Sequence, residues 1–184
     1  MSFLHISNLL KFYQFCKVKF IFFNEVYNME NNKLITIEAK VNAPIDKVWE
    51  LWNSPEHIIK WCAASDDWHT TYAESDLKER GKFNSRMEAK DGSFGFDFSG
   101  VYDDIEKHKK ITYTIDDGRK VWITFSKVGD SIEIIETFEA ETENPIEMQK
   151  EGWQAILNNF KKYAENKNNW DKLRFSININ APVE

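Results

Sequence analysis

Residues 145–166 read PIEMQKEGWQAILNNFKKYAEN, and their apolar spacing is the clearest structural signal in the chain. Pro145 suits the first turn of a helix, because proline fixes φ and the first helical amide needs no partner. Acidic residues near the start and lysines near the end complement the helix dipole. Residues at three- and four-residue steps form one apolar stripe, namely Trp153, Ile156, Leu157, Phe160 and Ala164. The stretch predicts one long helix that needs an apolar surface to cover.

Before this helix, the sequence alternates apolar and polar residues with period two, which is typical of strands with one buried face. The dipeptides Asp91-Gly92 and Asp117-Gly118 fall between such stretches and indicate hairpin turns. Strands joined by hairpins run antiparallel. Six strands are predicted in this way, at residues 35–41, 81–90, 94–103, 111–116, 120–128 and 131–141.

Two short helices are expected after the first strand. Pro44 opens residues 45–53, IDKVWELWN, and Ser54 caps a second helix that carries Trp61. Residues 62–77, CAASDDWHTTYAESDL, are expected to form a polar loop. The predicted fold class is α+β: a curved six-stranded antiparallel sheet wrapped around the long C-terminal helix, with two short helices after strand 1. A pocket is expected between the sheet and the long helix.

Four motifs in this order resemble the START-like, helix-grip proteins grouped as SRPBCC, close to the branch of the activator of heat-shock protein 90 ATPase homologue (AHSA-like). The resemblance covers about residues 33–166 and implies the helix-grip fold. It leaves activity open, because that superfamily includes lipid carriers, hormone receptors, cyclases, hydroxylase subunits and co-chaperone domains. Arg80 stands where the family usually has glycine, and we expect this to change only a turn. The motifs are VNAPIDKVWELWNSPEHIIKW (41–61), RGKF (80–83), MEAKDGSFGFDFSGVYDDI (87–105) and ENPIEMQKEGWQAILNNFKKYAEN (143–166).

Composition excludes several partners. The formal net charge of −6 argues against nucleic-acid binding, which needs a basic face. Cys16 and Cys62 provide neither a disulfide framework nor a metal-binding spacing, so a reducing, cytoplasmic setting is predicted. The chain has no stretch of about 20 nearly uncharged residues, as a membrane-spanning helix requires. We therefore expect no nucleic acid, no membrane insertion and no cofactor.

Three segments are predicted. Residues 1–28 form an aromatic-rich N-terminal extension outside the fold, with translation starting at Met29 favoured over an amphipathic anchor. Residues 29–166 form the START-like domain. Residues 167–184 combine a linker with the first strand of a truncated second copy, since FSININAPVE at the end repeats the pattern of ITIEAKVNAPID at residues 35–46. A coincidental polar tail is the alternative.

The segment from Cys62 to His69 combines sulfur, imidazole and carboxylates, which are metal ligands in other proteins. Their spacing fits no standard structural zinc site, so no metal is predicted. We expect the segment to rim a pocket mouth, with Trp68 as a lid or packing residue. His69 is a candidate general acid or base, because the ordinary histidine pKa lies near neutrality. The alternative is a solvated or structural histidine.

Glu136 is the second candidate catalytic residue. It alternates with Ile134 and Phe138, which places it on the apolar face of its strand. A carboxylate there must be paired, hydrated or raised in pKa. It either anchors a ligand, with Arg86 as a possible partner, or a bulge turns it outward. The candidate ligand-binding residues are Trp61, Trp68, His69, Tyr102, Tyr113, Trp122, Glu136 and Trp153.

These observations favour a protein that binds a hydrophobic or amphipathic small molecule in a cavity between the sheet and the C-terminal helix. One alternative is a cyclase- or hydrolase-like enzyme, of the polyketide cyclase kind, that uses His69 and Glu136 in the same cavity. Another is a co-chaperone-like module that binds a protein partner. The sequence shows no Ser-His-Asp set, phosphate-binding glycine loop or paired-carboxylate motif, which weighs against an enzyme.

Overall fold

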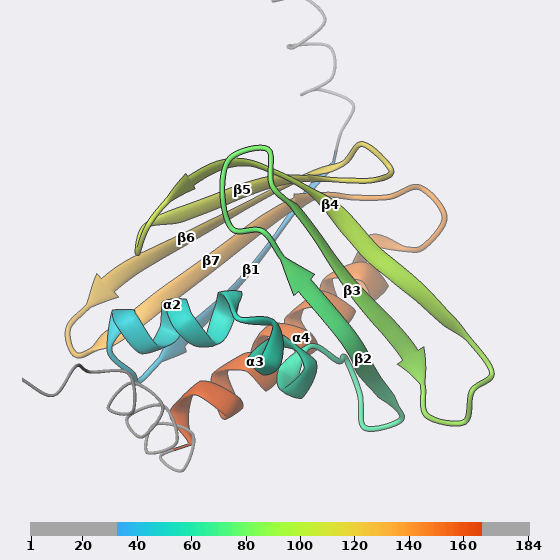
Figure 1. The fold of residues 1–184 in the computed structure, drawn as a ribbon, viewed down its shortest axis with the longest axis horizontal. Helices are drawn as coiled ribbons and strands as arrows, with labels where there is room; N and C mark the ends of the chain where they lie inside the picture. The colour runs from blue at the N-terminus through green and yellow to red at the C-terminus, as the bar shows by residue number, and fades with distance from the viewer. Residues whose placement is uncertain (1–32, 167–184) are drawn as a thin grey trace, which may run out of the picture. The chain divides into compact units, whose positions relative to one another are not determined.

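The structure, a computed structural model, describes residues 33–166. Seven strands form one sheet in the order β1-β7-β6-β5-β4-β3-β2, and it curves around a long helix (Figure 1). The strand pairs from β2 to β7 are all antiparallel. In chain order the elements are β1 (Leu34–Val41), α2 (Ile45–Asn53), α3 (Pro55–Trp61), β2 (Trp68–Ser75), β3 (Lys82–Ala89), β4 (Gly95–Glu106), β5 (Lys110–Ile115), β6 (Lys120–Val128), β7 (Ser131–Glu139) and α4 (Ile146–Glu165).

The apolar alternation of the strands builds the inner face of the sheet. In β7 every second residue is buried, beginning with Ile132 and ending with Phe138. In β1 the same period buries Ile35 and Ile37. Because side chains alternate between the two faces of a strand, these residues share the concave face and form the core with α4. The helix-grip fold predicted from the sequence is confirmed.

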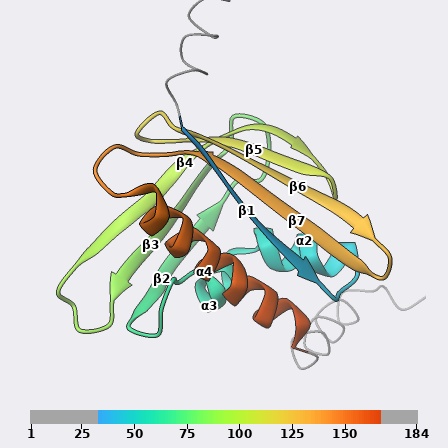
Figure 2. The same ribbon diagram turned by 180° about the vertical axis from the view of Figure 1, so that it is seen from behind.

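Helix α4 runs across the concave face of the sheet (Figure 2). Its predicted apolar stripe is confirmed, since Leu157, Phe160 and Ala164 are buried. The two short helices close one end of the sheet against α4. Their tryptophans hold the junction, because the rings of Trp52 and Trp61 lie 4.7 and 5.0 Å from the ring of Phe160.

The sheet has seven strands where six were predicted, because the expected polar loop at residues 62–77 contains β2. This edge strand pairs with β3, with Thr70 opposite Met87 and Tyr72 opposite Arg86. The register shifts between Thr70 and Tyr72, so one residue is inserted as a bulge. The bulge breaks the period-two alternation, which is the signal that revealed the other strands.

Arg80, which stands where the family usually has glycine, has an unusual backbone conformation in the turn before β3. Arg80 has a φ of 62°, in the left-handed region that glycine adopts without strain. Gly81 next to it is required for a different reason. A Cβ atom on Gly81 would lie 1.8 Å from the carbonyl oxygen of Asp76, so no side chain fits there.

The predicted N-terminal extension (1–28) and the repeated strand-like tail (167–184) lie outside the described residues. Within residues 33–166, no helix combines the length and the apolar character needed to cross a membrane.

Candidate functional site

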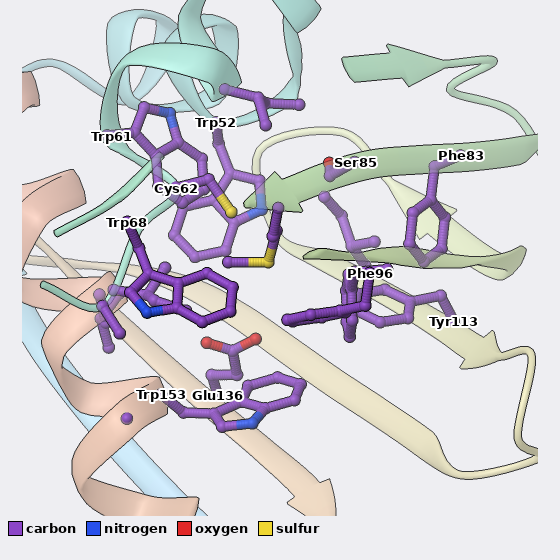
Figure 3. Close-up of a pocket in the computed structure, with 18 of the residues that line it drawn as sticks. Trp52, Trp61, Cys62, Trp68, Phe83, Ser85, Phe96, Tyr113, Glu136 and Trp153 are labelled. Carbon is purple, nitrogen blue, oxygen red and sulfur yellow. The ribbon is translucent and has the colours of Figure 1, made fainter. Parts of the chain in front are cut away.

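A cavity of about 630 Å³ lies among the inner face of the sheet, the α3–β2 segment and α4 (Figure 3). This volume is in the range of small-molecule sites, about 300–1,000 Å³. The long helix contributes its middle turns, including Gly152 and Leu157, and β3 contributes Ser85 and Met87. Aromatic rings dominate the lining: Trp52, Trp61, Trp68, Phe83, Phe96, Phe98, Tyr102, Tyr113 and Trp153.

Ring-to-ring packing holds these walls in place. Phe83 of β3 meets Tyr113 of β5 edge to face, with centroids 4.9 Å apart. Phe98 of β4 meets Trp153 of α4 at 5.8 Å, also near perpendicular. Such edge-to-face pairs add about 0.5–1.5 kcal/mol each beyond the area that they bury. The walls are therefore formed before any ligand arrives.

Glu136 faces inward, without a bulge. Its strand partner on β6 is the buried Ile123, and its own side chain is only 6% exposed. Figure 3 shows its carboxyl group pointing into the space between the indoles of Trp68 and Trp153. Burial raises its pKa from 4.5 to about 8, because the charged form loses hydration. At neutral pH in the empty protein, this group is therefore mainly an uncharged acid.

Glu136 has no hydrogen-bond or ion-pair partner among the described residues. Arg86, the partner considered from the sequence, is used elsewhere. Its guanidinium donates to Glu88 at 2.8 Å and to Asp97 at 3.2 Å. The possible pairing of Arg86 with Glu136 is therefore not found, because Arg86 alternates with inward Ser85 and Met87 and points to the other face of β3.

Three other titratable groups of the cavity stay uncharged. Burial raises the pKa of the Cys62 thiol to about 11. Burial, and then the nearby charge of Glu136, hold the pKa of Tyr113 well above its usual value. The pKa of Tyr102 is also raised by burial, and its hydroxyl lies 2.9 Å from that of Ser75. The thiol and the phenols therefore stay protonated here, which makes them poor nucleophiles.

Arg119 also lines the cavity and carries a guanidinium group. It follows the β5–β6 turn, where Gly118 adopts a φ of 91°. Its guanidinium donates twice to the carboxylate of Asp117, at 2.9 and 2.8 Å, and once to the carbonyl of Glu139 at 3.2 Å. Its positive charge is therefore already paired with Asp117.

The mouth of the cavity has an apolar rim. Trp68 and Phe96 line the cavity, with ring centroids 5.9 Å apart, and Phe94 packs beside both. Phe94 is 63% exposed, and Met148 in the first turn of α4, which also lines the cavity, is 59% exposed. Trp68 therefore packs against two phenylalanines and lines the cavity.

The structure brings together most of the predicted ligand-binding residues. Trp122 is an exception, because it lies between inward Val121 and Ile123 on β6 and so faces the opposite side of the sheet. His69 is another exception, because it lines a smaller neighbouring pocket instead of the main cavity. The residues that do line the main cavity are Trp61, Trp68, Tyr102, Tyr113, Glu136 and Trp153.

Sequence reasoning missed several lining residues. Strand alternation could have found Phe98, which shares a face of β4 with the predicted Tyr102, whereas Phe83 shares the inner face of β3 with Ser85 and Met87 and had no such neighbour. Trp52 and Arg119 carried no such signal, because they reach the cavity from a helix and a turn. Among the described residues, no group of three or more histidine, cysteine or acidic side chains could hold a metal ion.

The fold and the cavity define a helix-grip protein, in which a curved antiparallel sheet and a C-terminal helix enclose an apolar space. Residues 42–165 match the family model described as "Activator of Hsp90 ATPase homolog 1-like protein". The chain belongs to this family and carries an AHSA1-like SRPBCC domain. The resemblance read from the sequence motifs is confirmed.

Solved structures agree with this assignment. The solution structure of the AHSA1-like protein from Aeromonas hydrophila is 43% identical, with a TM-score of 0.70, over 74% of this chain and 94% of that chain. A protein from Cytophaga hutchinsonii is 55% identical, with a TM-score of 0.64, over 72% and 92% of the two chains. A protein from Nitrosomonas europaea, 15% identical with a TM-score of 0.63 over 73% and 96%, shares the fold alone. No curated protein is similar enough in sequence to match.

Proposed function

We propose that this protein binds a hydrophobic or amphipathic small molecule, without covalent attachment, in the cavity between the sheet and α4. The observation that carries the proposal is the aromatic-lined space of about 630 Å³. Protein interiors are normally packed to crystal density, and unfilled apolar space lowers stability. A cavity of this size is therefore expected to be stabilised by an occupant.

The physical driving force is burial of apolar surface. Each Å² of ligand surface removed from water contributes about 25 cal/mol, before the cost of immobilising the ligand. That cost is reduced when the site is formed in advance. Here Trp153 is fixed by contacts with Phe98 and Phe138, so little side-chain freedom is lost when a ligand arrives.

Gly152 offers a direct test. It lines the cavity from α4, and a Cβ atom placed on it meets no other atom within 4 Å. Leucine there can enter the open space without a clash, and it also favours the helix more than glycine does. A neutral fluorescent probe, N-phenyl-1-naphthylamine, should bind the wild type, and Gly152→Leu should weaken binding at least tenfold while the melting temperature stays level or rises.

The matched control is Asn158→Leu, which places the same side chain on an exposed position of the same helix. It should leave the affinity for the probe unchanged. The proposal fails if the wild type does not bind the neutral probe, or if Gly152→Leu binds it as tightly as the wild type does. The enzyme alternative has less support, because His69 and Glu136 line different pockets.

A second candidate function, a protein-interaction module, is favoured by the exposed aromatic rim of Phe94 and Phe96 and by the family description. Single exposed apolar residues are ordinary, but a cluster can mark an interaction site. Stimulation of the ATPase of a purified Hsp90 by the wild type, and its loss in Phe94→Ser, would support this candidate. An unchanged ATPase rate would count against it. A cytoplasmic location stays a prediction from cysteine usage.

A further inference from the structure

The surroundings of Glu136 narrow the chemistry of the ligand. The side chain leaves the inner face of β7 and ends in open space, between the indole of Trp153 on α4 and the indole of Trp68 on β2 (Figure 3). Tyr113 and Phe96 stand beyond it in the same view. The carboxyl group thus lies among aromatic side chains from four different elements, and Glu136 is the one acidic residue in the described lining of the cavity.

Among the described residues that line the cavity, none offers this group an unpaired positive charge. Arg119 lines the same cavity, but its guanidinium is held by two hydrogen bonds to Asp117. The residues that α4 contributes to the lining carry no charge, and neither do those of β2 and β3. A buried carboxylate that lacks a counter-charge is costly, so the missing positive charge is the feature that an occupant can supply.

We infer that the ligand is an organic cation, with a positively charged nitrogen that bears apolar substituents, and that Glu136 pairs with this nitrogen among these aromatic side chains. This inference rests on the proposed function and names its ligand class. The faces of tryptophan, tyrosine and phenylalanine rings attract cations through their quadrupoles, so the walls and the carboxylate favour the same charge.

A bare metal ion fits this site poorly. Hard cations such as Ca²⁺ need six to eight oxygen ligands, and one carboxylate surrounded by rings cannot provide them. A neutral hydrogen-bonding ligand can meet the protonated form of Glu136, but it lacks the added attraction that the ring faces offer to a cation. An alkyl- or aryl-substituted ammonium uses the carboxylate, the rings and the apolar walls formed by Ile156 and Leu157 together.

Binding of the cation to Glu136 should release a proton. Glu136 in the empty cavity has a pKa of about 8, so at neutral pH a bound cation displaces the proton of the acid into solvent. The affinity for a permanent cation should therefore rise about tenfold per pH unit below pH 8 and level off above it. The other titratable groups of the cavity do not compete, since burial raises the pKa values of Cys62, Tyr102 and Tyr113, and the guanidinium of Arg119 is held by Asp117.

The experiment compares two probes of the same shape. The cation is (2-naphthylmethyl)trimethylammonium, and the neutral probe is 2-neopentylnaphthalene, in which carbon replaces the nitrogen. Titration calorimetry at pH 6, 7, 8 and 9 should show the cation gaining at least 50-fold in affinity across this range, while the neutral probe stays constant. Buffers of different ionisation enthalpy should report close to one proton released per cation at pH 7.

Glu136→Gln keeps the shape of the side chain and removes its charge. At pH 8.5 it should bind the cation at least tenfold more weakly, with no pH dependence, while binding the neutral probe unchanged. Glu133→Gln is the matched control, since Glu133 lies on the outer face of the same strand, 3.6 Å from Lys40. It should behave as the wild type does.

The outcomes separate the two proposals. Binding of both probes with no preference, no pH dependence and no proton release overturns the organic-cation inference and leaves the proposed function standing. Failure of the wild type to bind either probe overturns both. The proton-release measurement uses the wild type alone, so the inference can be refuted even if Glu136→Gln does not fold.

Discussion

The indole of Trp153 lies flat on the ring of Phe138, with centroids 4.0 Å apart and planes inclined by 15°. This stack joins the middle of α4 to the inner face of β7. Phe138 is fully buried, whereas Trp153 also lines the cavity beside Glu136. One side chain therefore both anchors the helix and forms a wall of the site.

Truncating this anchor should cost stability. Trp153→Ala should lower the free energy of unfolding by about 3 kcal/mol, because the contacts with Phe138 and Phe98 are lost and a void is left. Urea denaturation followed by circular dichroism measures the loss. Trp122→Ala, on the outer face of β6, is the control and should cost less than about 1 kcal/mol. Equal losses in the two variants would contradict the anchoring role of the stack.

Glu136 should make stability fall as the pH rises. Its pKa is about 8 in the folded protein and 4.5 ordinarily, so the folded state holds the proton more tightly. The resulting stabilisation is fully present below pH 4.5 and is lost as the pH rises to about 8, by up to about 1.4 kcal/mol per pH unit. The wild type should therefore lose about 3 kcal/mol relative to Glu136→Gln between pH 5.5 and 8.

Urea midpoints of both proteins at half-unit pH steps test this prediction. Subtracting the two curves cancels the other titrating groups, including His57, whose pKa is lowered by burial. A difference that stays constant across this pH range would show that Glu136 keeps an ordinary pKa when the protein folds.

Adjacent residues in the turn before β3 should respond in opposite ways to substitution. Arg80→Gly removes left-handed strain of about 1–2 kcal/mol but gives the unfolded chain more freedom, so the net gain should be about 0.5–1 kcal/mol. Gly81→Ala should destabilise by at least about 2 kcal/mol, since its Cβ would overlap the carbonyl oxygen of Asp76. Thermal unfolding monitors both; a lower melting temperature in Arg80→Gly would refute the strain at that position.

Cys62 should react slowly with alkylating reagents. A thiol with a pKa of about 11 is about one part in a thousand thiolate at pH 8, and the thiolate is the reactive form. In a Cys16→Ser background, iodoacetamide should modify Cys62 about 100-fold more slowly than it modifies N-acetylcysteine. Unfolding in urea should restore the fast rate. Rapid labelling of the folded protein would contradict the burial of this thiol.

The sequence predicted helices and strands best where the spacing of apolar residues kept one period without interruption. The helical steps from Trp153 to Ala164 and the alternation of β7 each indicated which face is buried, and the structure agrees. The bulge between Thr70 and Tyr72 interrupts the period in β2. For this reason the sequence predicts a loop where the structure has an edge strand of mixed polarity. Alternation would have excluded Trp122, because it falls between inward Val121 and Ile123, whereas its aromatic character suits either face of a sheet.

Local periodicity told which side chains share a face, because neighbours two residues apart in a strand or three to four apart in a helix are placed by backbone geometry. It therefore gave the sheet, the long helix and the inward direction of Glu136. The cavity came from the assembled fold: Trp68, Tyr113 and Trp153 lie far apart in sequence and meet across different elements. The fold also showed that Arg86 and Arg119 are paired elsewhere, and so left Glu136 facing open space. Distances between such side chains depend on how the sheet curves around the helix, which no short-range pattern encodes.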